Sequence, residues 1–259
     1  NILEADVDDN TIKDVAERIG DAQEVLKSKQ FPFRFLSAYR ELKTVCNGKV
    51  PIIMDSLEDA VQASAQNIKG FSKETRVLLA CDVSGSMYTP ISPKSSVKNY
   101  DIGLVLAMLL RNRCENVVTG IFGDTWKAVA MPLRGILSNV EQMYKREGEV
   151  GYSTNGYKVI EYLRNKNIQM DKVMMFTDCQ MWNSYGSGQT IQSEWKKYKE
   201  IAPKAKLYLF DLNGYGQSPL NLADNDVVLI AGWSDRVFDM LDAIEQGGNV
   251  LAKIKEIEL

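Results

Sequence analysis

From residue 75 onward, short runs of β-branched and aliphatic residues alternate with longer amphipathic segments. This alternation is typical of a mostly parallel sheet covered by helices on both faces, because parallel strands need long crossover connections. The expected strands are residues 76–81, 117–122, 127–131, 172–176, 206–210 and 226–230, and the expected helices are residues 98–114, 136–147, 155–166, 191–202 and 235–246. Residues 102–110 are apolar nearly all round, so this helix should be buried against the sheet.

Residues 1–74 show helical periodicity and no convincing alternation of polar and apolar residues. Apolar side chains recur at helical spacing in two groups: Ile12, Val15, Ile19, Ala22 and Leu26, then Phe35, Leu36, Tyr39, Leu42 and Val45. A third helix is expected over about residues 55–68. The chain is therefore predicted to have two parts, a small all-α segment over residues 1–74 and an α/β domain over residues 75–259.

Composition excludes several classes of chemistry. The chain contains no histidine, which rules out Ser-His-Asp and Cys-His catalysis and every imidazole metal site. Its 31 basic and 34 acidic residues leave a formal charge of −3, so nucleic acid or an anionic membrane would have to be attracted by a local patch. No apolar run approaches the roughly 20 residues that a membrane-spanning helix needs, and we expect no membrane contact.

The cysteines and the first residues bear on the cellular compartment. Four cysteines, Cys46, Cys81, Cys114 and Cys179, form none of the close C-x-x-C pairs that zinc and redox sites use. This usage favours a reducing compartment, and the expected location is the cytoplasm. The chain opens at Asn1 without a signal-like segment, so we expect it to be part of a longer protein.

One constellation of oxygen-bearing residues follows two of the expected strands. Residues 77–81 run into Asp82, Ser84 and Ser86, and residues 173–176 run into Thr177 and Asp178. In a parallel sheet both aspartates emerge at the same carboxyl edge, where they would repel each other unless a cation lay between them.

Between these two strands, a loop over residues 151–156 offers the hydroxyl of Thr154. Taken singly, each residue has an ordinary alternative, because Asp82 can stabilise a turn and Thr154 can cap a helix. Their joint occurrence favours a site for a hard divalent cation, for which oxygen ligands are preferred.

These residues resemble the metal-ion-dependent adhesion site of von Willebrand factor A (vWA) domains, and the resemblance covers residues 75–259. It implies a Rossmann-like α/β fold and a bound Mg²⁺, with Mn²⁺ or Ca²⁺ as alternatives. The implied ligands, direct or through water, are Asp82, Ser84, Ser86, Thr154 and Asp178. It further implies an open coordination position that takes an acidic side chain from a protein partner. Tyr152 and Ser153 stand where the family has a glycine pair.

The preceding helices resemble a second known arrangement. Residues 33–40, with the sequence FRFLSAYR, are similar to a segment of the Ro ribonucleoprotein family, in which a ring of helical repeats, the TROVE module, precedes a vWA domain. The resemblance implies a non-enzymatic protein of RNA quality control whose partners are single-stranded RNA and small noncoding RNAs. It also implies that most of the RNA-binding ring lies upstream of these residues.

A basic segment between Lys27 and Lys49 is the candidate RNA contact within this chain. Six basic residues, Lys27, Lys29, Arg34, Arg40, Lys43 and Lys49, face the single acid Glu41, a local excess of +5. Aromatic residues Phe31, Phe33, Phe35 and Tyr39 are interleaved with them. Arg34, Arg40 and Lys43 are predicted to contact RNA phosphates. For the aromatic residues we favour burial in the core, because apolar helical spacing usually indicates it.

Two other functions compete with this interpretation. An aspartate at a strand end is compatible with a metal-dependent phosphohydrolase, but Ser84 stands where a second aspartate would act as general acid. An adhesion-type protein-binding domain unrelated to RNA is the third candidate.

The remaining features carry weaker expectations. Residues 179–188 can form a wall of the metal face or anchor their own loop. Cys81 and Cys179 are expected to be small apolar fillers beside the site. The lysines at positions 196, 197 and 199 are expected to lie on a solvated helix face.

Overall fold

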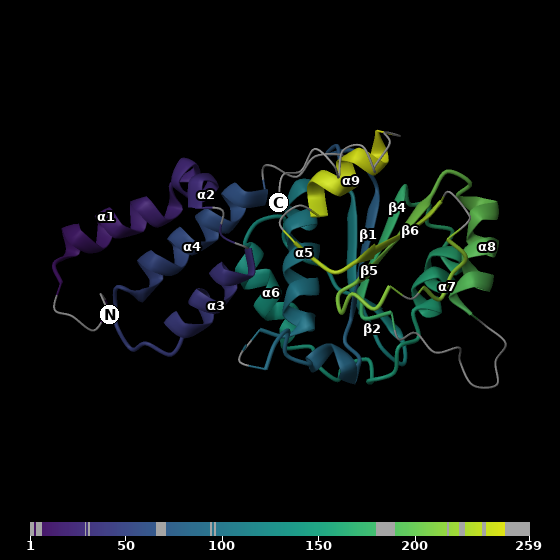
Figure 1. The fold of residues 1–259 in the computed structure, drawn as a ribbon, viewed down its shortest axis with the longest axis horizontal. Coiled ribbons are helices and arrows are strands. Elements are labelled where there is room, and N and C mark those ends of the chain that lie inside the picture. Colours follow the sequence, from purple (N-terminus) through teal and green to yellow (C-terminus); the bar gives the residue numbers. More distant parts are fainter. Residues whose placement is uncertain are drawn as a thin grey trace.

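The computed structural model describes residues 3, 7–28, 30, 32–65, 71–93, 95, 97–179, 190–216, 218–222, 226–234 and 237–246. These residues form an α/β domain with a helical segment packed at its side (Figure 1). The described strands are β1 (Val77–Asp82), β2 (Val117–Phe122), β3 (Trp126–Ala128), β4 (Lys172–Thr177), β5 (Lys206–Asp211) and β6 (Val227–Ala231).

The six described strands form one sheet in the order β3-β2-β1-β4-β5-β6. All neighbours pair in parallel except β2 and β3, which form an antiparallel pair at one edge. The mostly parallel α/β sheet is thus confirmed, although β3 is shorter than the predicted strand over residues 127–131. Because β1 and β4 are adjacent and parallel, the segments that follow Asp82 and Thr177 leave the sheet at the same edge.

Helices cover both faces of the sheet, as the alternating pattern predicts. The described helices of this domain are α5 (Asn99–Arg113), α6 (Ile136–Tyr144), α7 (Tyr157–Asn165), α8 (Ile191–Ile201) and α9 (Val237–Glu245), with a 3₁₀ turn η1 (Gly85–Tyr88) after β1. One apolar core joins α5, α6 and α9 to one face, and another joins α7 and α8 to the other. Every residue from Asn99 to Leu110 of α5 is buried, which confirms the expectation for that helix.

The described part of residues 1–74 is all-α, in agreement with the prediction. It contains α1 (Asp9–Gly20), α2 (Ala22–Ser28), α3 (Pro32–Leu42) and α4 (Val50–Ala65). The first apolar group falls on two helices, because Asp21 ends α1 and its carboxylate accepts a hydrogen bond from the Glu24 backbone at the start of α2 (2.8 Å). Leu36, Leu57 and Val61 join the same apolar core as α5.

Polar contacts also join the helical segment to the α/β domain. The Glu58 carboxylate of α4 accepts hydrogen bonds from the backbone N–H groups of Leu137 (3.0 Å) and Ser138 (2.7 Å). These groups lie in the first turn of α6, which has no intrahelical acceptors for them and carries the positive end of the helix dipole. Glu58 therefore caps a helix of the neighbouring part of the chain.

No described helix has the length and apolar character needed to cross a membrane.

Candidate metal centre

The end of β1 brings three oxygen-bearing side chains into one turn. Asp82 is the last residue of β1 and is fully buried. Its carboxylate accepts a hydrogen bond from the Ser84 backbone N–H (2.8 Å), which bends the chain directly into η1. In that bend the hydroxyl oxygens of Ser84 and Ser86 lie 3.3 Å apart. The alternation of Asp82, Ser84 and Ser86 therefore gathers oxygens, as expected from the spacing.

The end of β4 lies beside this turn. The Thr177 hydroxyl donates a hydrogen bond to the second carboxylate oxygen of Asp82 (2.6 Å) and accepts one from the Cys179 backbone (3.1 Å). Asp178, which lies between Thr177 and Cys179 in the sequence, is 1% exposed. Thr177 positions Asp82, a role that sequence reasoning missed although Thr177 directly precedes Asp178.

Burial and charge act together on the Asp82 carboxyl. Burial raises the pKa of Asp82 to about 7, and the negative charge of Asp178 adds to this effect, while hydrogen bonds from Thr177 and Ser84 oppose it. Burial, with the charges of Asp211, Asp178 and Asp82, likewise raises the pKa of the Cys179 thiol. Buried carboxylates therefore concentrate at this edge of the sheet, where a cation would relieve their repulsion.

Asp211, at the end of β5, is a buried carboxylate of this edge that the sequence prediction did not include. Its two oxygens accept hydrogen bonds from the backbone N–H groups of Gly214 (3.1 Å) and Gly216 (2.7 Å). Because these bonds hold the loop after β5, we assign Asp211 to loop structure and not to metal coordination.

The loop that carries Thr154 adjoins the turn after β1. The Gly85 backbone N–H donates to the Tyr152 carbonyl (3.3 Å), which links the two loops directly. Thr154 is 8% exposed, and the N-cap of α7 is Gly156. The alternative in which Thr154 serves as the helix cap therefore does not hold, and its buried hydroxyl remains available to the candidate site.

Asp124, in the turn between β2 and β3, anchors the same loop. Its carboxylate accepts a hydrogen bond from the Ser153 backbone (2.8 Å), and its carbonyl accepts one from the Asn155 side chain (3.1 Å). Gly151 has a φ of +77°, and a Cβ there would lie 2.2 Å from the Asp124 carboxylate. Only a glycine fits this approach. The bond from Ser153 lowers the pKa of Asp124.

The donor set suits a hard cation. In the described part of the chain no three His, Cys, Asp or Glu side chains cluster as a metal site would require. The candidate site has only two carboxylates, and its other three ligands are hydroxyls, so it would not form a cluster of this kind. Buried carboxylate and hydroxyl oxygens without sulfur or imidazole match the ligands that Mg²⁺ accepts in proteins. The predicted wall formed by residues 180–188 lies outside the described residues.

The predicted RNA contacts lie elsewhere, on α3 and just after it. Arg40 pairs with Asp101 of α5 (2.8 Å) and with Glu141 of α6 (2.7 Å), and its guanidinium lies over the Tyr144 ring (4.5 Å). Burial alone would lower the pKa of Arg40, but its two acidic partners raise it. Arg40 therefore holds the helical segment against the α/β domain, a role that the sequence prediction did not include.

The other members of the basic segment are mostly paired as well. Lys43 pairs with Glu141 (2.8 Å), Lys27 with Glu24 (3.1 Å) and Lys49 with Asp9 (2.9 Å), whereas Arg34 is exposed. Phe33, Phe35 and Tyr39 are partly buried and pack against the main core, in agreement with the expected core position of these aromatic residues. Lys29 and Phe31 lie outside the described residues. RNA contact by Arg34, Arg40 and Lys43 stays a prediction.

Comparison with one solved structure supports the fold. The structure is similar to the Ro (RSR) protein of Deinococcus radiodurans, with a TM-score of 0.68 and 19% sequence identity over 94% of this chain and 49% of that one. The chain thus spans about half the length of that protein. An aerotolerance-related membrane protein from Bacteroides fragilis NCTC 9343 gives a TM-score of 0.37 at 14% identity, covering 71% of this chain and 96% of that one. No curated protein matches the chain.

The family comparison covers most of the α/β domain. The Ro60 vWA domain family matches residues 76–244, more than half of the 259 residues. The match includes β1, β4 and all five candidate metal ligands, and it begins where the sequence pattern changes from helical to alternating. The chain therefore belongs to the Ro60 vWA domain family.

Proposed function

We propose that this chain is a non-enzymatic, divalent-metal-binding interaction domain of an Ro-like RNA-binding protein. The observation that carries the proposal is the arrangement at the carboxyl edge of the sheet. Buried Asp82 ends β1 and buried Asp178 follows the adjacent parallel strand β4, with the hydroxyls of Ser84 and Ser86 in the turn after β1 and Thr154 on the neighbouring loop. Mg²⁺ is the proposed ion, with Mn²⁺ and Ca²⁺ as alternatives that accept the same oxygen ligands.

The ligand set determines what the ion can do. Two carboxylates offset the charge of a divalent cation, while the neutral hydroxyls and water complete its coordination. A carboxylate from a protein partner is the ligand proposed for the open position, as the resemblance to the metal-ion-dependent adhesion site implies. The bound metal supplies an electrophilic anchor for that carboxylate, and the residues of this chain orient the anchor.

The RNA part of the proposal rests on family membership. The resemblance to the Ro ribonucleoprotein family implies RNA binding, and this chain spans about half of the Deinococcus Ro protein. We propose that noncoding or single-stranded RNA is the partner of the whole protein, with RNA quality control as its role. The four cysteines are free thiols in the described chain, which supports the proposed cytoplasmic location.

No feature of the described site favours the phosphohydrolase alternative. At position 84 the chain offers a hydroxyl in a turn with Ser86, and Thr177 uses its hydroxyl to hold Asp82. A phosphoryl-transfer site of that type would need a second carboxyl group to carry a proton at this position.

Calorimetric titration with Mg²⁺ and with Mn²⁺ tests the metal site. Asp82→Ala should abolish saturable binding, because it removes one of two carboxylates that hold a hard cation. The matched control is Asp14→Asn on the exposed surface of α1, which should bind metal as the unchanged chain does. Circular dichroism of each variant establishes that it is folded. Unchanged affinity in folded Asp82→Ala would remove Asp82 from the site and overturn the proposed function.

A further inference from the structure

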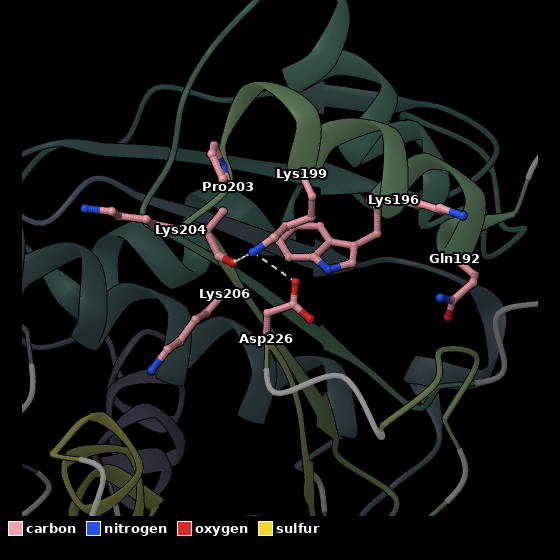
Figure 2. A pocket seen from close by; sticks show the side chains of 9 residues that line it. Gln192, Lys196, Lys199, Pro203, Lys204, Lys206 and Asp226 are labelled. Carbon is pink, nitrogen blue, oxygen red and sulfur yellow. Dashed lines mark hydrogen bonds and ion pairs between the residues drawn. The ribbon is translucent and has the colours of Figure 1, made fainter.

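A cleft of about 720 Å³ lies between α8, the start of β5 and the residue before β6. Four lysines line it, Lys196, Lys199, Lys204 and Lys206, and Asp226 is the single acid among its described lining residues. Figure 2 shows Lys204 and Lys206 toward one end of the cleft and Lys196 with Gln192 toward the other. The protein carries a formal charge of −3, so this concentration of cations is local.

Ion pairs leave the two ends of the cleft positive. In the middle, Lys199 pairs with Asp226 (2.9 Å) and donates to the Ala205 carbonyl (2.7 Å), and both interactions are drawn in Figure 2. Lys206 pairs with Glu245 at 3.3 Å. Lys196 and Lys204 are exposed and form no ion pair with any residue that the structure describes. An extended polyanion is the ligand that can meet both ends at once.

The uncharged polar groups of the cleft are hydrogen-bond donors. The side-chain oxygen of Gln192 accepts a hydrogen bond from the Asn221 backbone (2.8 Å), so its amide NH₂ remains as a donor. Trp195 is 3% exposed, and its indole N–H has no acceptor within the described ranges. Phosphate oxygens only accept hydrogen bonds, so this lining is complementary to a phosphodiester backbone.

The position of the cleft separates it from the metal centre. Lys206 is the first residue of β5 and Asp226 immediately precedes β6, so the cleft lies at the amino edge of the sheet. The candidate metal ligands lie at the opposite, carboxyl edge. The basic segment between Lys27 and Lys49 offers fewer unpaired cations to RNA, because Arg40 and Lys43 already pair with acids.

We propose that this cleft binds the phosphate backbone of single-stranded RNA, with Lys196 and Lys204 contacting phosphates at its two ends. The choice of RNA among polyanions rests on the proposed function. Lys196 and Lys199 were expected on a merely solvated helix face, but Lys199 is half-buried and both line the cleft. Binding through this cleft does not involve the metal.

Fluorescence anisotropy with a labelled single-stranded RNA oligomer, measured over a series of salt concentrations, tests the proposal on the full chain. Neutralising both end lysines in Lys196→Gln/Lys204→Gln should lower the slope of log affinity against log salt by about 1.4, since each phosphate contact contributes about 0.7 on single strands. The matched double variant Lys145→Gln/Lys166→Gln, at exposed lysines outside both candidate RNA surfaces, should leave the slope unchanged, and Arg34→Gln/Lys43→Gln tests the helical segment in the same assay. Both lysines of the first variant are exposed, so folding should persist, and thermal unfolding checks it.

Every other result counts against the cleft. Absence of RNA binding at low salt, or an unchanged slope in Lys196→Gln/Lys204→Gln, would overturn the assignment. A slope lowered only by Arg34→Gln/Lys43→Gln would move RNA to the helical segment, and binding lost with a chelator would move it to the metal face. Competition by a polyglutamate peptide as strong as that by RNA would identify an acidic protein as the ligand. The calorimetric metal titration is read independently, so failure of the cleft and failure of the metal site are distinguishable.

Discussion

Replacing Asp82 by asparagine should change how the stability of the metal-free protein depends on pH. Burial raises the pKa of Asp82 from 3.8 to about 7. The folded-state pKa lies above the unfolded value, so folding is favoured when the carboxyl is protonated. That contribution is complete below the unfolded pKa and is lost as pH rises through the folded pKa. Asp82→Asn removes the titrating group at nearly constant volume.

The magnitude follows from the pKa difference. At about 1.4 kcal/mol per pKa unit, the raised pKa of Asp82 should lower the free energy of unfolding of the metal-free protein by about 2 kcal/mol at about pH 5.5 and by about 4 kcal/mol at about pH 8, relative to low pH. The loss between these conditions is therefore about 2 kcal/mol. The chain contains no histidine, the residue that ordinarily titrates in this window, and burial raises the thiol pKa values of Cys81, Cys114 and Cys179. Most of the change should thus belong to Asp82.

Urea unfolding in the presence of a chelator, at both pH values, measures the effect. The free energy of unfolding of the unchanged protein should fall by about 2 kcal/mol relative to that of Asp82→Asn as pH rises. Saturating Mg²⁺ should then stabilise the unchanged protein by about 2.7 kcal/mol at 100 times its dissociation constant and leave the variant unaffected. Asp14→Asn serves as the control. Parallel pH profiles for Asp82→Asn and the unchanged protein would refute the reasoning about the buried carboxyl.

Four further outcomes are expected. Asp124→Ala alters no ligand but should weaken Mg²⁺ binding in calorimetry, because the loop that carries Thr154 loses the hydrogen bond from Ser153 to Asp124. An unchanged affinity in Asp124→Ala would show that this bond is not needed to position the loop. Thr154→Ala should weaken Mg²⁺ binding less than Asp82→Ala does. Arg40→Met should lower the free energy of unfolding by about 3 kcal/mol, since it leaves fully buried Asp101 without its cation. A change below about 1 kcal/mol would mean that the ion pair is not needed to hold the helical segment against the α/β domain. Colorimetric assays with generic phosphoesters and Mg²⁺ or Mn²⁺ should show no turnover, because Ser84 stands where a proton carrier is required; turnover that disappears in Asp82→Ala would establish an enzyme.

The candidate metal centre could be located from the sequence because the residues that define it follow strand ends locally. An apolar strand followed by Asp82, Ser84 and Ser86 is visible in a few residues, and the rule that parallel strands end at one edge adds Asp178 without knowledge of any contact. The supporting residues were not predictable in this way. Asp124 binds Ser153 across 29 positions, and nothing around Asp124 in sequence indicates that partner.

Counting charges along the chain does not show which cations of the basic segment are paired. Lys27 to Lys49 carries an excess of +5, yet Arg40 and Lys43 meet Glu141 at separations of 101 and 98 positions. Folding brings acids from α5 and α6 to α3, so a local sum of charges does not describe the field on the folded surface. The lysines of the cleft lie within eleven positions of one another in sequence, but only the fold shows that Lys199 pairs with Asp226 while Lys196 and Lys204 form no ion pair with any described residue.

By itself, the sequence determined the fold class, the division into helical and alternating parts, and the oxygen ligands expected to bind the metal. These features depend on periodicity and on the order of residues at strand ends, which act over one or two turns of chain. The tertiary structure alone decided which cations remain unpaired among the residues that the structure describes. Long, flexible lysine and arginine side chains find acidic partners through space and not along the chain, so only folding could pair Arg40 with Asp101 and leave Lys196 and Lys204 open to a ligand.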